Sequence, residues 1–241
     1  EIKFSPKEQN SQANIQMGVR VNMEIKKTPL NSLHKHNQAK FVEFAGYEMP
    51  IQYSKGIIEE HKFTRSHSGI FDVSHMGQLF IYGDERLTEE LEKIFPLDLK
   101  KLDQNSSKYS FLMNDDAGIY DDLIITKIEG GYLIILNAAC KEKDFEILST
   151  LLGKKFKMNL DKNRSLIALQ GPKSVEILKS ILNGVDKLKF MTGKWFDSNY
   201  ERLFITRSGY TGEDGFEISI SNDEAEEFTK NLIEKGAQLI G

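Results

Sequence analysis

Two short segments of this 241-residue sequence place adjacent carboxylates beside runs that read as β-strands. The first segment spans residues 114–125, NDDAGIYDDLII, with Asp121 and Asp122 at the start of an apolar run. Because successive side chains of a strand point to opposite faces, only one of the two acids can address a given site, and the other should be solvated or structural. An acid beside an apolar run is partly desolvated, which suits a proton acceptor or a hydrogen-bond partner of a nitrogen. The alternative is an ordinary turn aspartate.

The second segment is SGYTGEDG, residues 208–215, which joins two strand candidates and carries Glu213 and Asp214 between glycines. It is not a phosphate loop, because it has no lysine, matches neither GxGxxG nor GxxxxGK, and its acids would repel phosphate. A carboxylate on a loop that approaches a ligand closely suits an edge rich in N–H donors, such as an amidine or aminopyrimidinone ring. The alternative is a hairpin turn whose acids are solvated.

A third polar residue, Asn137, ends a predicted strand at residues 132–137. It would present its amide to the same cleft as Asp122 if the two strands are neighbours; otherwise it is a strand-end cap. The five histidines lack both the i, i+4 pairing and the carboxylate company of a metal site. The sequence therefore predicts no metal centre.

Composition limits the possible partners. The net charge of −4 comes from interspersed acids and lysines, so no basic stripe is present to bind nucleic acid. Cys140 is the only cysteine, which excludes an intramolecular disulfide and a thiolate zinc cluster. The apolar runs are far shorter than the ~20 residues of a membrane helix, so no membrane association is expected. Residues 1–27 are expected to be an N-terminal extension, disordered or foreign to the fold, and the patterned region is 28–241.

Short β-rich runs alternate with helical ones, which predicts an α+β fold. Strands are expected at residues 78–82, 109–113, 123–128, 132–137, 166–169, 202–206 and 216–220. Helices are expected at residues 87–95, 141–152, 173–183 and 222–235, the last with a capping box of Ser221 and Glu224 and a stop at Gly236.

Six segments, in order, resemble one family over nearly all of residues 28–241: the T protein of the glycine cleavage system, a tetrahydrofolate-dependent aminomethyltransferase. The segments are TPLNSLHKHNQAKFVEFAGYEMPIQY, GIFDVSHMGQ, YSFLMNDDAGIYDDLIIT, LIILNAACKEKDFEIL, IALQGPKS and RSGYTGEDGFEISI. Each is weak alone, and six in register are specific.

The resemblance implies the folate-binding aminomethyltransferase fold, with mixed and antiparallel sheets flanked by helices and two interleaved subdomains. It implies transfer of the methylene carried on the lipoyl arm of the H protein to tetrahydrofolate, with release of ammonia and without a metal or pyridoxal phosphate. The protein would lie in the bacterial cytoplasm or, in a eukaryote, the mitochondrial matrix. The family carries an arginine-containing segment and a β-rich domain after the position of Gly241, so the chain is expected to be a fragment that lacks this C-terminal domain.

The resemblance also assigns site residues. Asp122 matches the family's catalytic aspartate, with Asp121 its solvated companion. Glu213 matches a pterin-binding glutamate, and Asn137 matches a polar residue lining the same cavity. Tyr210 is expected to be an aromatic neighbour of the pterin ring.

Other members of the superfamily share the fold, so fold alone does not choose among them. They include a folate-binding protein linked to tRNA modification, sulfonium demethylases and the folate domains of dimethylglycine and sarcosine oxidation enzymes. The stretch from Tyr210 to Glu213 and the intact Asp-Asp pair favour the glycine cleavage enzyme, and a non-enzymatic folate-binding role is the alternative from another class. One departure is Ala117 where the family usually has glycine, which matters only if position 117 needs a positive φ.

Overall fold

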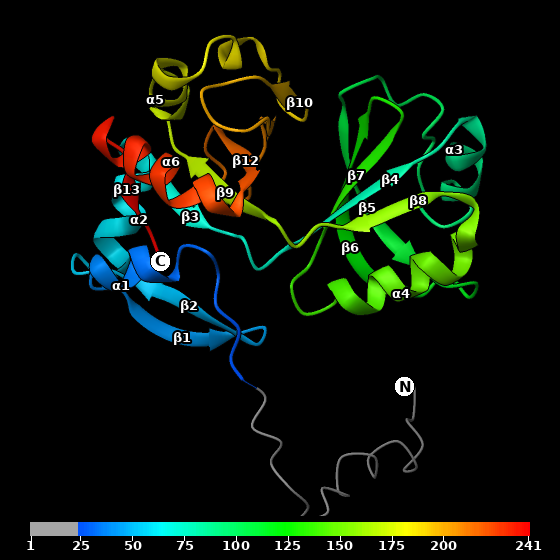
Figure 1. Ribbon diagram of the computed structural model, residues 1–241, viewed down its shortest axis with the longest axis horizontal. Coiled ribbons are helices and arrows are strands. Elements are labelled where there is room, and N and C mark those ends of the chain that lie inside the picture. The colour runs from blue at the N-terminus through cyan, green and yellow to red at the C-terminus, as the bar shows by residue number, and fades with distance from the viewer. Residues whose placement is uncertain (1–23) are drawn as a thin grey trace, which may run out of the picture.

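The structure, a computed structural model that describes residues 24–241, has two lobes, each built on one β-sheet (Figure 1). Sheet I, in lobe I, has the strand order β10-β11-β12-β9-β3-β13, and sheet II, in lobe II, has the order β5-β6-β7-β4-β8. A separate hairpin, β1 (Lys40–Phe44) and β2 (Tyr47–Gln52), lies beside lobe I. Every pairing in sheets I and II is antiparallel except β13 with β3, so the expected α+β fold with mixed and antiparallel sheets is confirmed.

The remaining elements are short. Sheet I contains β3 (Gly69–Asp72), β9 (Arg164–Gln170), β10 (Gly193–Phe196), β11 (Leu203–Thr206), β12 (Gly215–Ser221) and β13 (Gln238–Leu239). Sheet II contains β4 (Gly77–Tyr82), β5 (Ser107–Met113), β6 (Ile119–Ile128), β7 (Gly131–Leu136) and β8 (Lys157–Leu160). The α-helices are α1 (Asn31–His36), α2 (Ile57–Ser66), α3 (Glu85–Leu91), α4 (Lys141–Leu152), α5 (Ser174–Ile181) and α6 (Asn222–Glu234). Two 3₁₀ turns cover Gly153–Lys155 and Val185–Lys187.

Lobe II is inserted into lobe I. The chain leaves sheet I after β3, builds all of sheet II, and returns to sheet I at β9, which pairs with β3. The two lobes are therefore joined by residues 73–76 and 161–163, which Figure 1 shows between them. Of the expected N-terminal extension, residues 1–23 lie outside the described part of the chain, while Lys26 forms a β-bridge with Tyr47.

The seven strands expected from the sequence are all present, but β6 begins four residues earlier than the apolar run suggests. Asp121 pairs with Leu112 and Asp122 with Phe111 across the β5–β6 ladder. The two acids thus lie inside the strand instead of at its mouth, because ladder hydrogen bonds with β5 extend past the apolar residues.

The expected helices are present as well, with one local error at α6. Ser221 precedes this helix and Gly236 follows it at φ +103°, as predicted. The predicted capping box does not form, since the Ser221 side chain makes no cap hydrogen bond. The Glu224 carboxylate instead accepts a hydrogen bond from the Glu201 amide at 2.7 Å.

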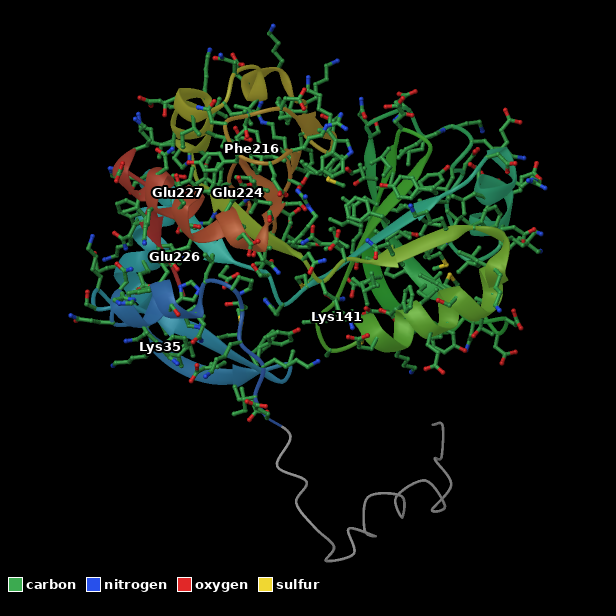
Figure 2. All side chains as sticks on the ribbon, viewed as in Figure 1. Lys35, Lys141, Phe216, Glu224, Glu226 and Glu227 are labelled. Atoms are coloured by element: carbon green, nitrogen blue, oxygen red, sulfur yellow. The ribbon has the colours of Figure 1, made fainter. Side chains whose placement is uncertain are left out.

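Each sheet buries its outer face against helices. In lobe I, Phe216, Ile218 and Ile220 of β12 are fully buried with Phe228 of α6, and Phe216 is labelled in Figure 2. In lobe II, alternate residues of β4 and β6 pack against α3 and α4. Each fully buried aliphatic or aromatic side chain contributes roughly 1.5 to 3 kcal/mol, so these two cores hold the sheets rigidly.

The inner faces of the two sheets face one another. Phe80 and Leu133 of sheet II form a small cluster with Phe204 of sheet I. Beside the cluster, the Ser219 hydroxyl hydrogen-bonds the Gln78 amide oxygen at 2.5 Å. The inner faces are therefore in direct contact at one end.

Lys141, at the start of α4, makes a second set of contacts between the lobes and is labelled between them in Figure 2. This nearly buried lysine donates to the Tyr47 hydroxyl at 2.8 Å and to the His75 carbonyl at 2.7 Å. Lobe II, the hairpin and the first crossing segment are thereby held together. No helix within residues 24–241 is long and apolar enough to cross a membrane.

Candidate functional site

The two acids of β6 point to opposite sides of sheet II. Asp122 shares its face with Ile128, which packs in the cluster between the sheets, so its carboxylate lies on the inner face and is half-buried. Asp121 shares its face with Leu123 and Ile125 of the lobe II core. The two side chains lie on opposite faces of the strand, as expected, with Asp122 on the inner face, and its role at a site stays a prediction.

Asn137, directly after β7, ties the two acids together. Its amide nitrogen donates to Asp121 Oδ1 at 3.0 Å, to the Asp122 carbonyl at 3.0 Å and to Asp122 Oδ1 at 3.2 Å. The contact exists because β6 and β7 are neighbours in sheet II, which was the condition set by the sequence. One amide group thus restrains the backbone and the carboxylate of Asp122.

The expectation that Asp121 is solvated is wrong. Asp121 is only 9% exposed, and its Oδ2 has no hydrogen-bond donor among the described residues. The strand alternation that brings Asp122 to the inner face sends Asp121 toward α4, where it meets the Asp144 carboxyl. Asp121 is a buried polar group of the lobe II core.

The loop between β11 and β12 is held by Gln170 at the end of β9. The Gln170 amide nitrogen donates to the Ser208 carbonyl at 2.9 Å, and its amide oxygen accepts from the Thr211 hydroxyl at 2.8 Å. A Cβ at Gly209 would lie 2.0 Å from the Gln170 side chain, and Gly212 has φ +78°. These two glycines allow the close approach and the turn that any larger side chain would obstruct.

Both acids of this loop are paired with arginines of the same chain. Glu213 Oε1 accepts from Arg65 Nη1 at 3.0 Å, and Asp214 accepts from Arg207 through two guanidinium nitrogens. Hydrogen bonding from Arg207 holds the pKa of the Asp214 carboxyl below its usual value. Neither acid is a simply solvated turn residue, and the role of Glu213 as a ligand stays a prediction.

Tyr210 projects from the loop and is 70% exposed. Desolvation of its hydroxyl, followed by the negative charges of Glu217 and Asp122, raises the pKa of Tyr210 to about 12. Its hydroxyl therefore lies within the electrostatic field of carboxylates from both sheets. Tyr109, whose pKa is raised by desolvation and then by Asp122, occupies the same face of sheet II, paired across the ladder with Ile124.

Glu217 of β12 is a site residue that the sequence reading missed. It lies on the inner face of sheet I beside Ser219, opposite in direction to the buried Phe216 and Ile218. Its Oε2 accepts from the Ser208 hydroxyl at 2.5 Å, and burial raises the pKa of its carboxyl. The signal was present in the alternation of FEISI, where the single acid stands out of phase with the apolar residues.

The site thus brings carboxylates from two opposing sheets near two tyrosines. Asp122 comes from sheet II and Glu217 from sheet I, with Tyr109 and Tyr210 beside them. Carboxylates accept hydrogen bonds strongly in such partly desolvated places, and tyrosine rings offer flat apolar faces. The arrangement suits a planar ligand with several N–H donors. Within residues 24–241, no three His, Cys, Asp or Glu side chains form a group that could hold a metal ion.

A recess adjoins this site on the lobe I side. It is lined by residues of α2, β3 and the β11–β12 loop, including Arg65, Phe71, Tyr210 and Thr211. Tyr210 lines this recess, and the charges of Glu217 and Asp122 raise the pKa of its hydroxyl, so the recess adjoins the two carboxylates.

Comparisons with known proteins agree on one family. The family model of the GCVT N-terminal domain matches residues 30–240. The mitochondrial aminomethyltransferase of Dictyostelium discoideum is 42% identical over 213 residues, which are 84% of this chain and 52% of that relative. The aminomethyltransferase of Halothermothrix orenii is 39% identical, over 89% of this chain and 60% of that relative.

Solved structures give the same result. The crystal structure of the glycine cleavage system aminomethyltransferase T from Bartonella henselae matches with a TM-score of 0.83 and 37% identity, covering 90% of this chain and 60% of that one. A chain of the heterotetrameric sarcosine oxidase from Corynebacterium matches with a TM-score of 0.55 and 13% identity, which shows the fold alone. The chain spans a little over half the length of the curated relatives it matches.

Proposed function

Because the chain belongs to the family of the GCVT N-terminal domain, we propose that the natural full-length protein is the aminomethyltransferase of glycine cleavage. In this proposal it transfers the methylene of the aminomethyl group on the lipoylated H protein to tetrahydrofolate and releases ammonia. Support comes from the names of the relatives, which are aminomethyltransferases at about 40% identity. The observation that carries the proposal is the Asp122 carboxylate, fixed by Asn137 on the inner face of sheet II.

The inner faces fit a pterin. The edge of its pyrimidinone ring carries an amino group and ring N–H groups, which need acceptors, and the Glu217 and Asp122 carboxylates on the two inner faces are acceptors. The ring itself is planar, and Tyr109 and Tyr210 supply flat faces close to those carboxylates. We assign pterin recognition to Glu217, which lies within β12 on the inner face of sheet I, in preference to Glu213, which lies on the loop and forms an ion pair with Arg65.

Bound tetrahydrofolate would supply the ring nitrogens that capture the methylene group. The chain's own part is to position and to accept a proton. Asn137 holds both the backbone and the side chain of Asp122, so the carboxylate has little freedom to rotate away from a nitrogen placed between the sheets. A carboxylate fixed in this way acts as hydrogen-bond acceptor and as general base, which typically contributes ~10² to 10⁴ in rate.

Partner and compartment follow from the same proposal. The partner is the lipoylated H protein, with no metal and no pyridoxal phosphate used by the chain. The compartment is the mitochondrial matrix if the source is eukaryotic, as for the mitochondrial relatives, and the cytoplasm if it is bacterial.

The test is methylene transfer by the natural full-length protein from loaded H protein to tetrahydrofolate, measured beside folate binding. We expect transfer by the native protein and its loss in Asp122→Asn with folate binding kept within a few fold. Glu146→Gln, which removes one exposed charge from α4, is the matched control and should behave as the native protein. Folate binding without any transfer would reject the enzyme in favour of a folate-binding protein of the same superfamily.

A further inference from the structure

Behind Asp122, lobe II buries two carboxyl groups that face each other. Asp144, on the first turn of α4, is 1% exposed, and neither of its side-chain oxygens has a donor among the described residues. Asp121 has one oxygen in the same condition, and its carboxyl contacts that of Asp144. Three buried carboxyl oxygens thus converge without an N–H or O–H group from any side chain that the structure describes.

The charged and titratable groups around this pair do not neutralise it. The Lys143 ammonium lies over the Tyr120 ring, 5.5 Å from its centroid, and its charge lowers the pKa of Asp144 less than burial and Asp121 raise it. Burial, then the charges of Asp121 and Asp144 and a hydrogen bond to Asp121, raises the pKa of the Cys140 thiol, so this neutral S–H group is a weak donor to Asp121 and brings no positive charge. Asp122 adds a further carboxylate on the other face of β6. Because two buried carboxylates in contact cannot both ionise without a cation, a proton must lie between them.

We propose that Asp121 and Asp144 share one proton, and that this carboxyl pair positions Asn137 and, through it, Asp122. The positioning half of the proposal rests on the proposed function. With the proton on the Asp144 side, Asp121 Oδ2 accepts it and Asp121 Oδ1 remains free to accept from the Asn137 amide. Asp144 is thus a positioning residue that touches no substrate.

The backbone supports the transmission of this contact. The Asn137 carbonyl accepts from the amides of Cys140 at 3.0 Å and Lys141 at 2.8 Å, at the start of the helix that carries Asp144. Its side chain reaches the two acids of β6. Asn137 is therefore hydrogen-bonded to α4 by its main chain and to β6 by its amide group. A change in the distance between Asp121 and Asp144 would shift the partners of both sets of hydrogen bonds.

The carboxyl pair holds the shared proton only over a limited pH range. Burial, followed by hydrogen bonding to Asp121 and the Asp121 charge, raises the pKa of Asp144 to about 7. Below that pH the pair carries one proton. Above it the second charge appears beside Asp121, and like charges in contact repel one another.

The first experiment does not depend on the enzymatic activity of the protein. Carbon-13 resonances of labelled aspartates are followed against pH in the natural full-length protein, in Asp144→Asn and in Glu146→Gln. We expect one aspartate titration near pH 7 in the native protein and in Glu146→Gln, absent in Asp144→Asn, and a shift of the Asn137 side-chain amide resonance at the same pH. If no aspartate titrates above about pH 5, or if the Asn137 resonance does not respond, the proposal is wrong.

The second experiment uses single-turnover methylene transfer as a function of pH. The native rate is expected to decline above pH 7, where the pair loses its proton. An asparagine at position 144 keeps an N–H donor for Asp121, so Asp144→Asn should retain the rate at pH 6 within about threefold and show no such decline. Asp144→Leu removes the donor and should lower the transfer rate about tenfold or more with folate affinity unchanged. A decline retained in Asp144→Asn would overturn the positioning role. Absence of transfer by the native protein would instead reject the proposed function, while the resonance titration still decides whether the proton is shared.

Discussion

The chain carries two pairs of adjacent acids, one in each lobe, and the fold treats them in opposite ways. Asp121 and Asp122 lie inside β6, with no arginine or lysine of residues 24–241 bonded to either, while Glu213 and Asp214 lie on a loop where Arg65 and Arg207 bond one each. In the strand, alternation of faces separates the acids, and one becomes buried. In the loop, both acids stay near the surface and are neutralised. Asp122 of the strand pair is therefore better able than the loop acids to accept a hydrogen bond or a proton from a ligand.

The two pairs of acids also differ in what holds them in place: ion pairs with arginine in the loop, and neutral hydrogen-bond donors in the strand. The loop pair gains ion pairs that fix the loop, and a bonded carboxylate has fewer free lone pairs to offer. The strand pair is fixed by neutral groups, since the Asn137 amide donates to both acids and the Tyr109 hydroxyl hydrogen-bonds Asp122. Neutral positioning thus preserves the acceptor strength of the carboxylate.

The largest expected effect tests the division of labour within the strand pair. In the full-length protein, Asp122→Asn should reduce methylene transfer by ~10² to 10⁴, because a positioned proton acceptor is lost. Folate affinity, measured by calorimetric titration, should change by only a few fold. Asp121→Asn should reduce transfer less, through the position of Asn137. A greater loss in Asp121→Asn than in Asp122→Asn would reverse our assignment of the two faces.

The pH dependence of stability should differ between the buried carboxyl groups Asp121 and Asp144 of lobe II and the acids of the loop. Asp144 has a folded pKa raised to about 7, so its contribution to the free energy of unfolding is complete below the unfolded pKa near 4 and is lost as pH rises through 7. Asp214 has a lowered folded pKa, so its contribution is present above pH 4 and lost as pH falls further.

Urea unfolding of the native protein and Asp144→Asn at several pH values measures the first effect. The native protein should lose about 2 to 4 kcal/mol relative to the variant between pH 4 and pH 8. A constant difference between the two across that range would show that Asp144 is not the group that titrates.

The next effect compares the loop acid with the strand acid of lobe I. Glu217→Gln should weaken folate binding by roughly 1.5 to 3 kcal/mol, since a charged acceptor on the inner face is lost. Glu213→Gln should weaken it less, because Arg65 already occupies its Oε1. Calorimetric titration of both variants decides between them. A larger loss in Glu213→Gln would return pterin recognition to the loop.

The smallest effect concerns the turn that leads into β6. Ala117 has φ +60°, so the departure from glycine at this position carries a backbone cost of roughly 1 kcal/mol. Ala117→Gly should raise the free energy of unfolding by about 0.5 kcal/mol, the remainder being offset by the greater freedom of glycine in the unfolded chain. Gly130→Ala, at φ +73° in the next turn, is the mirror control and should lower stability. A loss of stability in Ala117→Gly would contradict the account.

The sequence predicted the strands that alternate or run apolar, and it predicted the helices with an apolar face. It did not predict the hairpin of β1 and β2, because Val42, Phe44 and Ile51 are exposed and no burial pattern marks the strands. It also did not predict α2, whose sequence IIEEHKFTRS has few buried apolar positions.

At the site, the same rule of alternation explains both the success and the failures. It predicted that only one of Asp121 and Asp122 lies on a given face, and the choice of Asp122 came from the family resemblance and stays a prediction. The contact of Asn137 followed from the adjacency of two consecutive strands. The burial of Asp121 was not predictable in this way, since its partner Asp144 comes from a later helix. Glu217 was predictable from alternation, because it is the one acid of the FEISI stretch and stands out of phase with the apolar residues.

The insertion of lobe II between β3 and β9 also bears on how the chain folds. The two strands pair directly, Phe71 with Ala168, so their ladder closes a loop that contains all of sheet II. Closing so long a flexible loop is entropically costly, and the cost falls when the loop is already compact. Sheet II pairs only strands drawn from residues 77–160, so it can form without sheet I. The order of assembly that follows is lobe II first, with β3 and β9 then meeting across a folded insert whose ends lie side by side.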